Sequence, residues 1–358
     1  MNQSLLPEAK DLGVYVQERA FAEMLWPNFF PVRNVMSLSY ETLIGSKGAP
    51  VAADVVTWDT SAPEKTRKAI SKLTGEIPPI RMKKKMSEKD LIDYYAAKNS
   101  GYAGIQQILD LVYGDTDACV DGVNARLEWL ALKALSQTYV ALSKTTNGGG
   151  VVTASNIDFQ MPTANKKCAS VVWSATASTT KPITDFRTVV AAARLAGVKL
   201  KYALMDVTDF GYFTASTETQ NTVYAMLGTS KITIAPTLEM ANNALRSYGL
   251  PEILLIEQSI TTETEGAHTQ TSANPWVTGH VTFVPDMVVG DMLSGPIMEE
   301  LNPPKQVTQT KVGPILVSKY SEVDPVAEYT KGEANAFPSW PTVNSCYSLY
   351  TLNASTWA

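Results

Sequence analysis

The sequence contains few of the residues that most enzymes and metal proteins use. It has only two histidines, His268 and His280, and three widely separated cysteines, Cys119, Cys168 and Cys346. No Cys-x-x-Cys pair occurs, so neither a disulfide framework nor a zinc site is predicted. The chain also has no phosphate-binding glycine loop, no Gly-x-Ser-x-Gly and no His-Glu-x-x-His motif. We therefore predict no catalytic residues, no metal and no cofactor, and a protein that is not an enzyme.

Charge and long apolar runs are scarce as well. Only 18% of the 358 residues are charged, 45% are hydrophobic, and the formal net charge is -5. No stretch of ~18 apolar residues occurs, and the first residues do not have a signal-peptide pattern. An acidic balance does not favour a sequence-specific DNA-binding protein. We expect a folded, soluble protein made inside the cell, with a weakly charged surface of the kind that neighbouring copies can cover.

An aromatic cluster marks the N-terminal segment. Trp26, Phe29 and Phe30 stand beside Pro27 and Pro31. A segment this short cannot bury such side chains by itself, so it must dock on another surface. Two alternatives remain open, because the aromatic side chains can pack on the body of their own chain or contact a neighbouring subunit. We take Trp26, Phe29 and Phe30 as candidates for a subunit interface.

The most basic part of the chain lies between residues 65 and 89, where nine basic residues stand against two acidic ones. Short β-like pieces, such as residues 51–58, and several glycines and prolines indicate no compact core between residues 39 and 86. Because opposite charges steer association, we predict that this segment lies across an acidic surface of another copy. A solvated loop is one alternative, and a nucleic-acid patch, which here lacks aromatic residues for stacking on bases, is another. The interface candidates in this segment are Lys65, Arg67, Lys68, Lys72, Arg81, Lys83, Lys84 and Lys85.

Helical patterns follow over residues 87–98 and 115–143, and the second is the strongest element of the chain. Its apolar residues form a stripe broad enough to pack on more than one side. Ser87 with Asp90 is an N-cap pattern for the first helix. After a glycine run, residues 151–159 and 167–174 are predicted to form a long hairpin.

Strands and helices alternate from residue 182 onward, which indicates a mixed α/β region. The expected elements are a helix at 183–195, a strand at 199–207, a helix at 236–248, a strand at 253–259, a polar loop at 261–273 and a strand at 277–284. The strand at 277–284 is predicted to pair with the one at 253–259. Strand patterns return at residues 315–318 and 346–352.

Acidic residues offer one alternative site. Asp206 and Asp209 follow the strand at 199–207, and the carboxyl end of a strand is where α/β enzymes place their chemistry. Asp is also a common turn and helix-cap residue, so the pattern has a structural explanation too. The adjacent Glu299 and Glu300 are expected to be solvated.

The order of these segments resembles that of the major capsid proteins of tailed bacteriophages, in particular the lambda-type capsid protein E family with the HK97-like (Hong Kong 97) fold. The stretches that carry the resemblance are LWPNFFPVRNVMSLSYETLIG, PPIRMKKKM, PWVTGHVTFVPDMVVGDMLSGPI and AEYTKGEANAFPSWPTVNSCYSLYTL. The resemblance implies an α+β fold with an N-terminal arm (1–39), an extended β loop (40–86), a peripheral domain with a spine helix and β hairpin (87–181), an α/β axial domain (182–300) and returning strands (301–358).

The resemblance also implies a function, namely a major capsid (head) protein of a tailed phage or prophage. Such a protein self-assembles into pentamers and hexamers of an icosahedral shell that encloses double-stranded DNA. The expected partners are further copies of the chain, portal and scaffolding proteins and a decoration protein, with no sequence-specific DNA binding and no membrane. The expected location is the virion capsid, after assembly in the bacterial host cytoplasm. An encapsulin-like compartment shell protein and an α/β enzyme with a carboxylate site near Asp206 are the alternatives.

Overall fold

The chain forms two compact units, each assembled from separate stretches of sequence. The computed structural model describes residues 23–44, 71–99, 102–142, 147, 155–226, 234–263, 269–304, 307–324 and 326–357. Unit 1 comprises residues 1–40, 75–130 and 291–339, and unit 2 comprises residues 41–74, 131–290 and 340–358. The domain boundaries that the resemblance implies stay a prediction.

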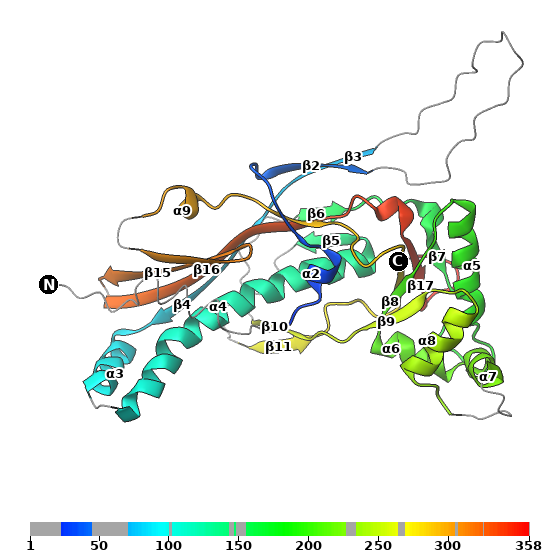
Figure 1. Cartoon of the computed structure of the whole chain (residues 1–358), viewed down its shortest axis with the longest axis horizontal. Helices are drawn as coiled ribbons and strands as arrows, with labels where there is room; N and C mark the ends of the chain where they lie inside the picture. Colours follow the sequence, from blue (N-terminus) through cyan, green and yellow to red (C-terminus); the bar gives the residue numbers. More distant parts are fainter. Residues whose placement is uncertain are drawn as a thin grey trace, which may run out of the picture. The chain divides into compact units, whose positions relative to one another are not determined.

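Unit 1 is built around a long strand, β16 (Val326–Ser339), which is the centre of a mixed sheet (Figure 1). On one edge, β16 pairs antiparallel with β15 (Ile315–Val323), which in turn pairs with β14 (Thr308–Val312). On its other edge, β16 pairs with β4 (Pro79–Met86) and then with β13 (Asp291–Ser294).

Strand β1 (Val32–Asn34) completes this sheet by pairing in parallel with β13. The short helices α2 (Trp26–Phe29) and α9 (Met298–Leu301) belong to the same unit. Two further strands, β2 (Ser39–Ile44) and β3 (Ser71–Glu76), pair with each other. The β piece expected at 51–58 is in the sequence between them and lies outside the described residues.

The helix predicted at 87–98 is confirmed as α3 (Glu88–Asn99). The predicted cap is present too, because Ser87 N and Ser87 Oγ donate to Asp90 Oδ2 at 2.9 and 2.6 Å. The strongest predicted helix is α4 (Tyr102–Gln137), which begins earlier than expected and ends six residues sooner. It ends because Thr138 takes a positive φ of 65°, after which the chain continues as β5 (Tyr139–Leu142).

Helix α4 packs closely against the sheet of unit 1. A small apolar cluster lies between them and comprises Val120, Val123, Ile315, Val317 and Ala334. A Cβ atom on Gly332 of β16 would lie 2.8 Å from the carbonyl oxygen of Cys119 on α4. Likewise, a Cβ atom on Gly122 would collide with the Met82 sulfur. Glycine is therefore required at 332, where the close atom belongs to the backbone, whereas the flexible Met82 side chain could move aside at 122.

Unit 2 contains a five-stranded sheet in the order β7-β17-β12-β8-β9. Its strands are β7 (Lys166–Cys168), β17 (Tyr347–Tyr350), β12 (His280–Val284), β8 (Tyr202–Asp206) and β9 (Glu252–Ile256). Its helices are α5 (Pro182–Leu195), α6 (Val207–Ala215), α7 (Thr217–Met226) and α8 (Leu238–Ser247) (Figure 1). Short 3-10 turns occur at Thr163–Asn165 and Val343–Ser345.

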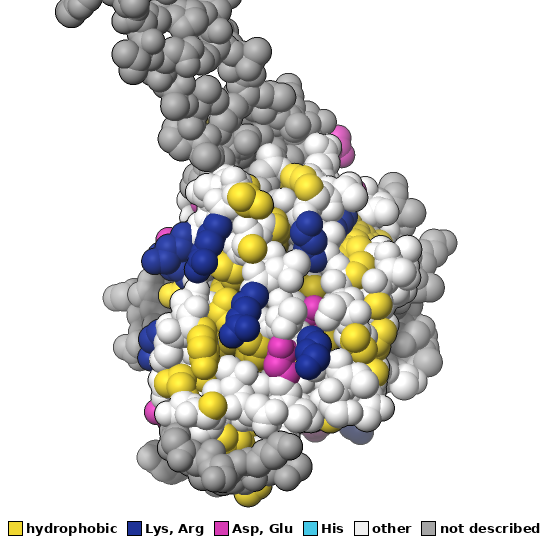
Figure 2. Space-filling view, turned by 90° about the vertical axis from the view of Figure 1, so that its right-hand side faces the viewer, with side chains coloured by type: hydrophobic (Ala, Val, Ile, Leu, Met, Phe, Trp, Pro, Cys, Tyr) yellow, Lys and Arg dark blue, Asp and Glu magenta, His cyan; other side chains and the backbone are white. Residues whose placement is uncertain are grey.

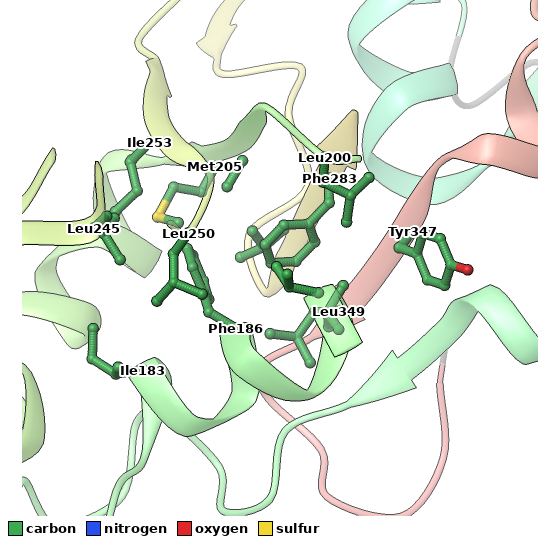
Figure 3. Packing of buried hydrophobic residues seen from close by; sticks show 14 of the residues in the cluster. Ile183, Phe186, Leu200, Met205, Leu245, Leu250, Ile253, Phe283, Tyr347 and Leu349 are labelled. Carbon is green, nitrogen blue, oxygen red and sulfur yellow. The ribbon is translucent and has the colours of Figure 1, made fainter. Parts of the chain in front are cut away.

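The core of unit 2 is formed by side chains from both the sheet and the helices. Phe186 of α5 and Phe283 of β12 meet edge to face, with ring centroids 4.8 Å apart. Met205, Leu245 and other buried side chains pack around them (Figure 3). Burying a side chain of this size contributes about 1.5–3 kcal/mol, so this cluster is the main source of stability in the unit.

Two strand pairings predicted from the sequence are wrong. The hairpin expected from 151–159 and 167–174 does not form, because β6 (Ser155–Asp158) pairs with β5 and β7 pairs in parallel with β17. The strand expected at 277–284 is present as β12, but β8 lies between it and β9. Alternating apolar residues identify a strand, whereas the choice of partner depends on the whole fold.

The polar loop expected at 261–273 is a hairpin of β10 (Ile260–Glu263) and β11 (Gln270–Ala273). Its side chains are mostly exposed and polar, so the sequence has no apolar alternation that predicts these strands. The hydroxyl groups of Thr261 and Ser272 lie across the hairpin, with Oγ1 and Oγ 2.7 Å apart. The helices at 183–195 and 236–248 and the strands at 199–207, 253–259, 315–318 and 346–352 are confirmed with shifted ends. Within the described ranges, no helix is long and apolar enough to cross a membrane.

Candidate functional site

The three aromatic interface candidates are buried within their own chain. Trp26 and Phe29 in α2 are 4% and 2% exposed, and Phe30 is fully buried. The structure therefore has the first of the two arrangements that the sequence left open, in which this segment docks on the body of its chain. A contact of Trp26, Phe29 or Phe30 with another copy stays a prediction.

A buried carboxylate, Glu128 of α4, holds the aromatic segment in place. Its Oε2 accepts the hydrogen bond that Trp26 N donates at 2.7 Å, at the first turn of α2. Burial raises the pKa of Glu128 to about 7, while the backbone hydrogen bonds from Trp26 and Leu25 lower it. The sequence contains one indication that Glu128 is buried, because this acid directly follows Leu127, which belongs to the apolar stripe of the predicted helix.

The basic candidates on β4 face two sides of the strand. Ile80 and Met82 pack on the apolar cluster against α4. Since side chains alternate along a strand, Arg81 and Lys83 face the other side. The Arg81 guanidinium pairs with Glu333, with Nη2 at 2.7 Å and Nε at 2.8 Å from Oε1.

Lys83, Lys84 and Lys85 are all exposed, but Lys83 and Lys84 also have interactions within the chain. Lys83 Nζ lies 4.3 Å from the centroid of the Tyr329 ring. Burial raises the pKa of Asp115, and the positive charges of Lys84 and Lys319 lower it. Of the other basic candidates, Lys65, Arg67 and Lys68 lie outside the described residues, and Lys72 is on β3, where side chains are not described.

A cluster of ion pairs on β16 was not indicated by the sequence pattern. Lys331 Nζ donates to Glu333 Oε2 at 2.7 Å and also to Glu299 Oε1. Burial acts to lower the pKa of Lys331, but its hydrogen bonds to Glu299 and Glu333 raise it overall. Because Glu333 also accepts from Arg81, a single buried carboxylate connects β4 to the centre of the sheet.

The expectation that Glu299 and Glu300 are solvated holds for Glu300, which is exposed, whereas Glu299 is half-buried; both also form ion pairs. Glu299 is bound to Lys331 and accepts from Ser318 Oγ at 3.1 Å, while Glu300 accepts from Lys311 Nζ at 2.8 Å with both of its oxygens. The sequence does not reveal these pairs, because the two acids are on helix α9 and their partners are on strands further along the chain.

A second charged residue hidden in unit 1 is Lys319 on β15, which is 3% exposed. Burial lowers its pKa to about 8, and the negative charges of Asp115 and Glu328 act in the opposite direction. An amine with this pKa is less basic than an exposed lysine, so its charge depends on these two carboxyl groups remaining close by.

Asp206 and Asp209, the carboxylates considered for an enzyme site, accept hydrogen bonds from groups within unit 2. Asp206 caps α6 by accepting from Asp209 N at 2.8 Å and also accepts from Thr278 Oγ1 at 2.6 Å. Asp209 accepts from Gly279 N at 2.7 Å and from Thr351 Oγ1 at 2.6 Å. Both side chains are buried, so their geometry is that of a structural connection.

Burial is the largest cause that raises the pKa of Asp209 to about 7, and the nearby charge of Asp206 adds to it. The hydrogen bonds from Thr351 and Gly279 act in the opposite direction. These bonds join the end of β8, the start of β12 and the end of β17. The helix-cap explanation of Asp206 is therefore confirmed.

His280 does not belong to a metal site among the residues that the structure describes. His280, on β12, is 2% exposed and stacks on Tyr350 at a centroid distance of 4.8 Å. Burial and the charge of Lys133 lower its pKa to about 4, so it is neutral at pH 7. His268 lies outside the described residues. Among described residues, no group of three or more metal-ligating side chains occurs.

Exposed apolar side chains provide further candidates for contacts between proteins. Val323 and Val326 are paired opposite each other at the turn of the β15–β16 hairpin and are 88% and 50% exposed. Met36, after β1, is 99% exposed. A single exposed valine is ordinary on a protein surface. Two exposed valines side by side at one hairpin tip form a small apolar surface that contact with another protein would bury.

Comparison with known proteins gives a consistent result. The family model described as phage major capsid protein E matches residues 8–350. A capsid protein described from a prophage of E. coli CFT073 has a similar structure, with a TM-score of 0.58, 13% identity, and coverage of 97% of this chain and 99% of that one. A phage-related protein from Bordetella bronchiseptica RB50 has a TM-score of 0.55, 12% identity, and coverage of 99% and 100%. No curated protein matches the sequence.

Proposed function

The chain belongs to the phage major capsid protein E family, and from this premise we propose that its copies assemble into the pentamers and hexamers of an icosahedral shell around double-stranded DNA. It is a capsid shell protein with the HK97-like fold. The observation that carries the proposal is the family match, which extends over residues 8–350 and so includes both units.

The proposed contact between copies involves only part of the basic segment. Arg81 is paired with Glu333, and Lys83 lies over Tyr329, so these two cations support the sheet of their own chain. Lys85 is exposed and forms no ion pair with any residue that the structure describes. We therefore assign the role in assembly to Lys85 and to the cations at 65, 67, 68 and 72, which would lie on an acidic surface of a neighbouring copy.

The N-terminal segment has a separate proposed role. Glu128 and the buried aromatic side chains anchor residues 25–30 to their own chain. Residues before this anchor would then reach a neighbouring copy from a defined starting point. This role agrees with the arm that the family resemblance implies, whose own contacts lie outside the described residues.

The proposal includes other partners and a location. We propose portal and scaffolding proteins and a decoration protein as partners, and assembly in the cytoplasm of a bacterial host before residence in the virion. We propose no catalytic function, and the hydrogen bonds that occupy Asp206 and Asp209 support this choice. No observation favours the encapsulin-like alternative.

The experiment is electron microscopy of the full chain expressed alone and together with a scaffolding protein, with sedimentation velocity on the same samples. Closed shells, or rings of five and six subunits, are expected. A small, homogeneous species in both samples and in every buffer would contradict self-assembly. The same preparation of a Lys85→Glu variant should contain folded subunits with fewer shells, and a Lys311→Ala variant, which loses only an exposed ion pair, is the control.

A further inference from the structure

The outer face of α5 and α8 in unit 2 carries an excess of cations. Lys and Arg side chains are spread over this side of the molecule, and acidic ones are few (Figure 2). Arg187 and Arg194 lie seven residues apart on α5, which is two helical turns, so they share one face of the helix. Lys199 follows in the segment after α5, and all three side chains are exposed.

These three cations differ from other exposed cations of unit 2 because they have no acidic partner among the described residues. Arg246 pairs with Glu252 at 2.9 Å and Lys201 pairs with Asp286 at 3.4 Å. Arg187, Arg194 and Lys199, in contrast, form no ion pair with any residue in the described ranges.

The two arginines are nevertheless positioned by their surroundings. Arg187 lies over the ring of Tyr248, with its central carbon 5.5 Å from the ring centroid. Arg194 Nη2 donates to the carbonyl oxygen of Gly249 at 3.5 Å. Both guanidinium groups are thus held near the end of α8, and their remaining N–H donors are available to a ligand.

The acid of α5 does not neutralise this face. Asp185, the only acidic residue of α5, is 4% exposed and points inward, where it accepts from Ser170 N and Trp173 Nε1, both at 2.9 Å. The exposed stripe between the arginines contains Thr188 and Ala191, which are small. Exposed cations beside small side chains suit a highly charged, hydrated partner more than an apolar one.

We propose that Arg187, Arg194 and Lys199 bind the phosphate backbone of the DNA that the shell encloses. This inference rests on the proposed function, and it places the outer face of α5 toward the interior of the shell. Guanidinium groups bind phosphate oxygens through paired N–H donors, and this binding needs no particular base sequence. Because the whole chain has a net charge of -5, attraction to DNA would be confined to this face and would weaken steeply with salt.

The test uses the full chain as unassembled subunits, verified by sedimentation, and a short fluorescent DNA duplex of random sequence. Binding is followed by fluorescence anisotropy between about 50 and 200 mM salt. The triple variant Arg187→Ala, Arg194→Ala and Lys199→Ala should bind at least about tenfold more weakly, with a salt slope that is shallower by about 3. The variant with both arginines changed to lysine should keep most of the binding, because the positive charges remain.

The matched control is the double variant Lys201→Ala and Arg246→Ala, which removes two exposed cations of the same unit that already have acidic partners. It should bind DNA nearly as tightly as the original chain. Circular dichroism and thermal unfolding of each variant separate loss of binding from loss of fold. If the triple variant does not fold, the single variants Arg187→Ala, Arg194→Ala and Lys199→Ala test the proposal, and each should bind DNA more weakly with a salt slope shallower by about 1.

Three results would overturn the inference. One is equal DNA binding by the triple variant and the original chain, and another is the absence of DNA binding by the original chain. The third is preferential binding of polyglutamate over DNA, which would assign the face to an acidic protein. Shell formation, measured separately by electron microscopy, tests the proposed function, so normal shells without DNA binding would reject only the further inference.

Discussion

Glu128 Oε2 accepts a hydrogen bond from the backbone N–H of Trp26 at 2.7 Å, although the two residues are 102 positions apart in the sequence. This bond joins the first turn of α2 to the C-terminal part of α4, inside unit 1. The bond gives the buried N–H of Trp26 a partner. It therefore helps to fix the short segment whose aromatic side chains at 26, 29 and 30 are buried against distant parts of the chain.

Replacing this carboxylate should loosen the N-terminal segment. In Glu128→Ala, the buried Trp26 N–H loses its partner, and the free energy of unfolding should fall by about 1–3 kcal/mol. Urea unfolding of the unassembled chain measures this change. Glu300→Ala, which removes an exposed ion pair with Lys311, should cost less than about 1 kcal/mol. An equal loss in both variants would contradict the role assigned to Glu128.

The contributions of Glu128 and Asp209 to stability should decrease as the pH rises from their unfolded pKa values to about 7, while buried His280, whose pKa is lowered to about 4, acts in the opposite direction. Burial raises the pKa of Glu128 and of Asp209 to about 7 each, above the value of an unfolded carboxyl group. Each group therefore contributes most to stability below its unfolded pKa, and this contribution is lost as the pH rises through about 7. Thermal unfolding at a series of pH values measures the effect. Glu128→Gln should have a shallower decrease, and an unchanged pH dependence in that variant would refute the assignment.

Two glycine substitutions should have effects of opposite sign. Gly332→Ala places a Cβ atom 2.8 Å from the Cys119 carbonyl oxygen, so α4 must move away from β16 and unfolding should become easier by about 1–3 kcal/mol. Gly211→Ala, in α6, meets no atom within 4 Å and should stabilise the chain by about 0.5–1 kcal/mol, since alanine is the better helix former. The midpoints of denaturant unfolding report both changes. Destabilisation by both substitutions to the same extent would show that close packing is not the cause.

Asp209 should matter for stability. In Asp209→Ala, Gly279 N and Thr351 Oγ1 both lose a buried acceptor, and each loss should cost about 1–3 kcal/mol. The connection between β8, β12 and β17 would be weakened, which thermal unfolding of the variant detects. Glu239→Ala, an exposed change on α8, is the control. Normal stability of Asp209→Ala, together with loss of a hydrolase activity, would revive the enzyme alternative.

Assembly through the basic segment should weaken as salt is added. The Debye length falls from ~10 Å at 0.1 M to ~3 Å at 1 M ionic strength, which screens attraction between exposed charges on neighbouring copies. Light scattering of assembling subunits across this range measures the effect. Assembly that does not depend on salt would point instead to apolar contacts, for which Val323 and Val326 are the first residues to change.

Several elements could be predicted because their signals are local. Helix α5 begins at Pro182, ends before Gly197, which has a positive φ, and presents Phe186 and Val189 to the core. Strand β8 is a short apolar run between turns. In such elements the periodicity of apolar residues and the end signals lie within about 15 neighbouring residues.

Other elements have no local signal. Strand β16 contains Lys331 and Glu333, which are unfavourable in a buried strand until Arg81 and Glu299 are placed beside them. The hairpin of β10 and β11 is polar except at its base, where Ile260 pairs with Ala273. A pattern search that looks for apolar alternation therefore passes over both elements.

The amino-acid sequence by itself determined the class of elements, the order of the segments and the resemblance to capsid proteins, because these depend on residues that are close together in the chain. Only the tertiary structure decided that Trp26 docks on Glu128, that Asp206 and Asp209 are structural, and which cations remain unpaired. Burial and ion pairing depend on contacts between distant residues, and their energies are set by the surroundings that the complete fold creates.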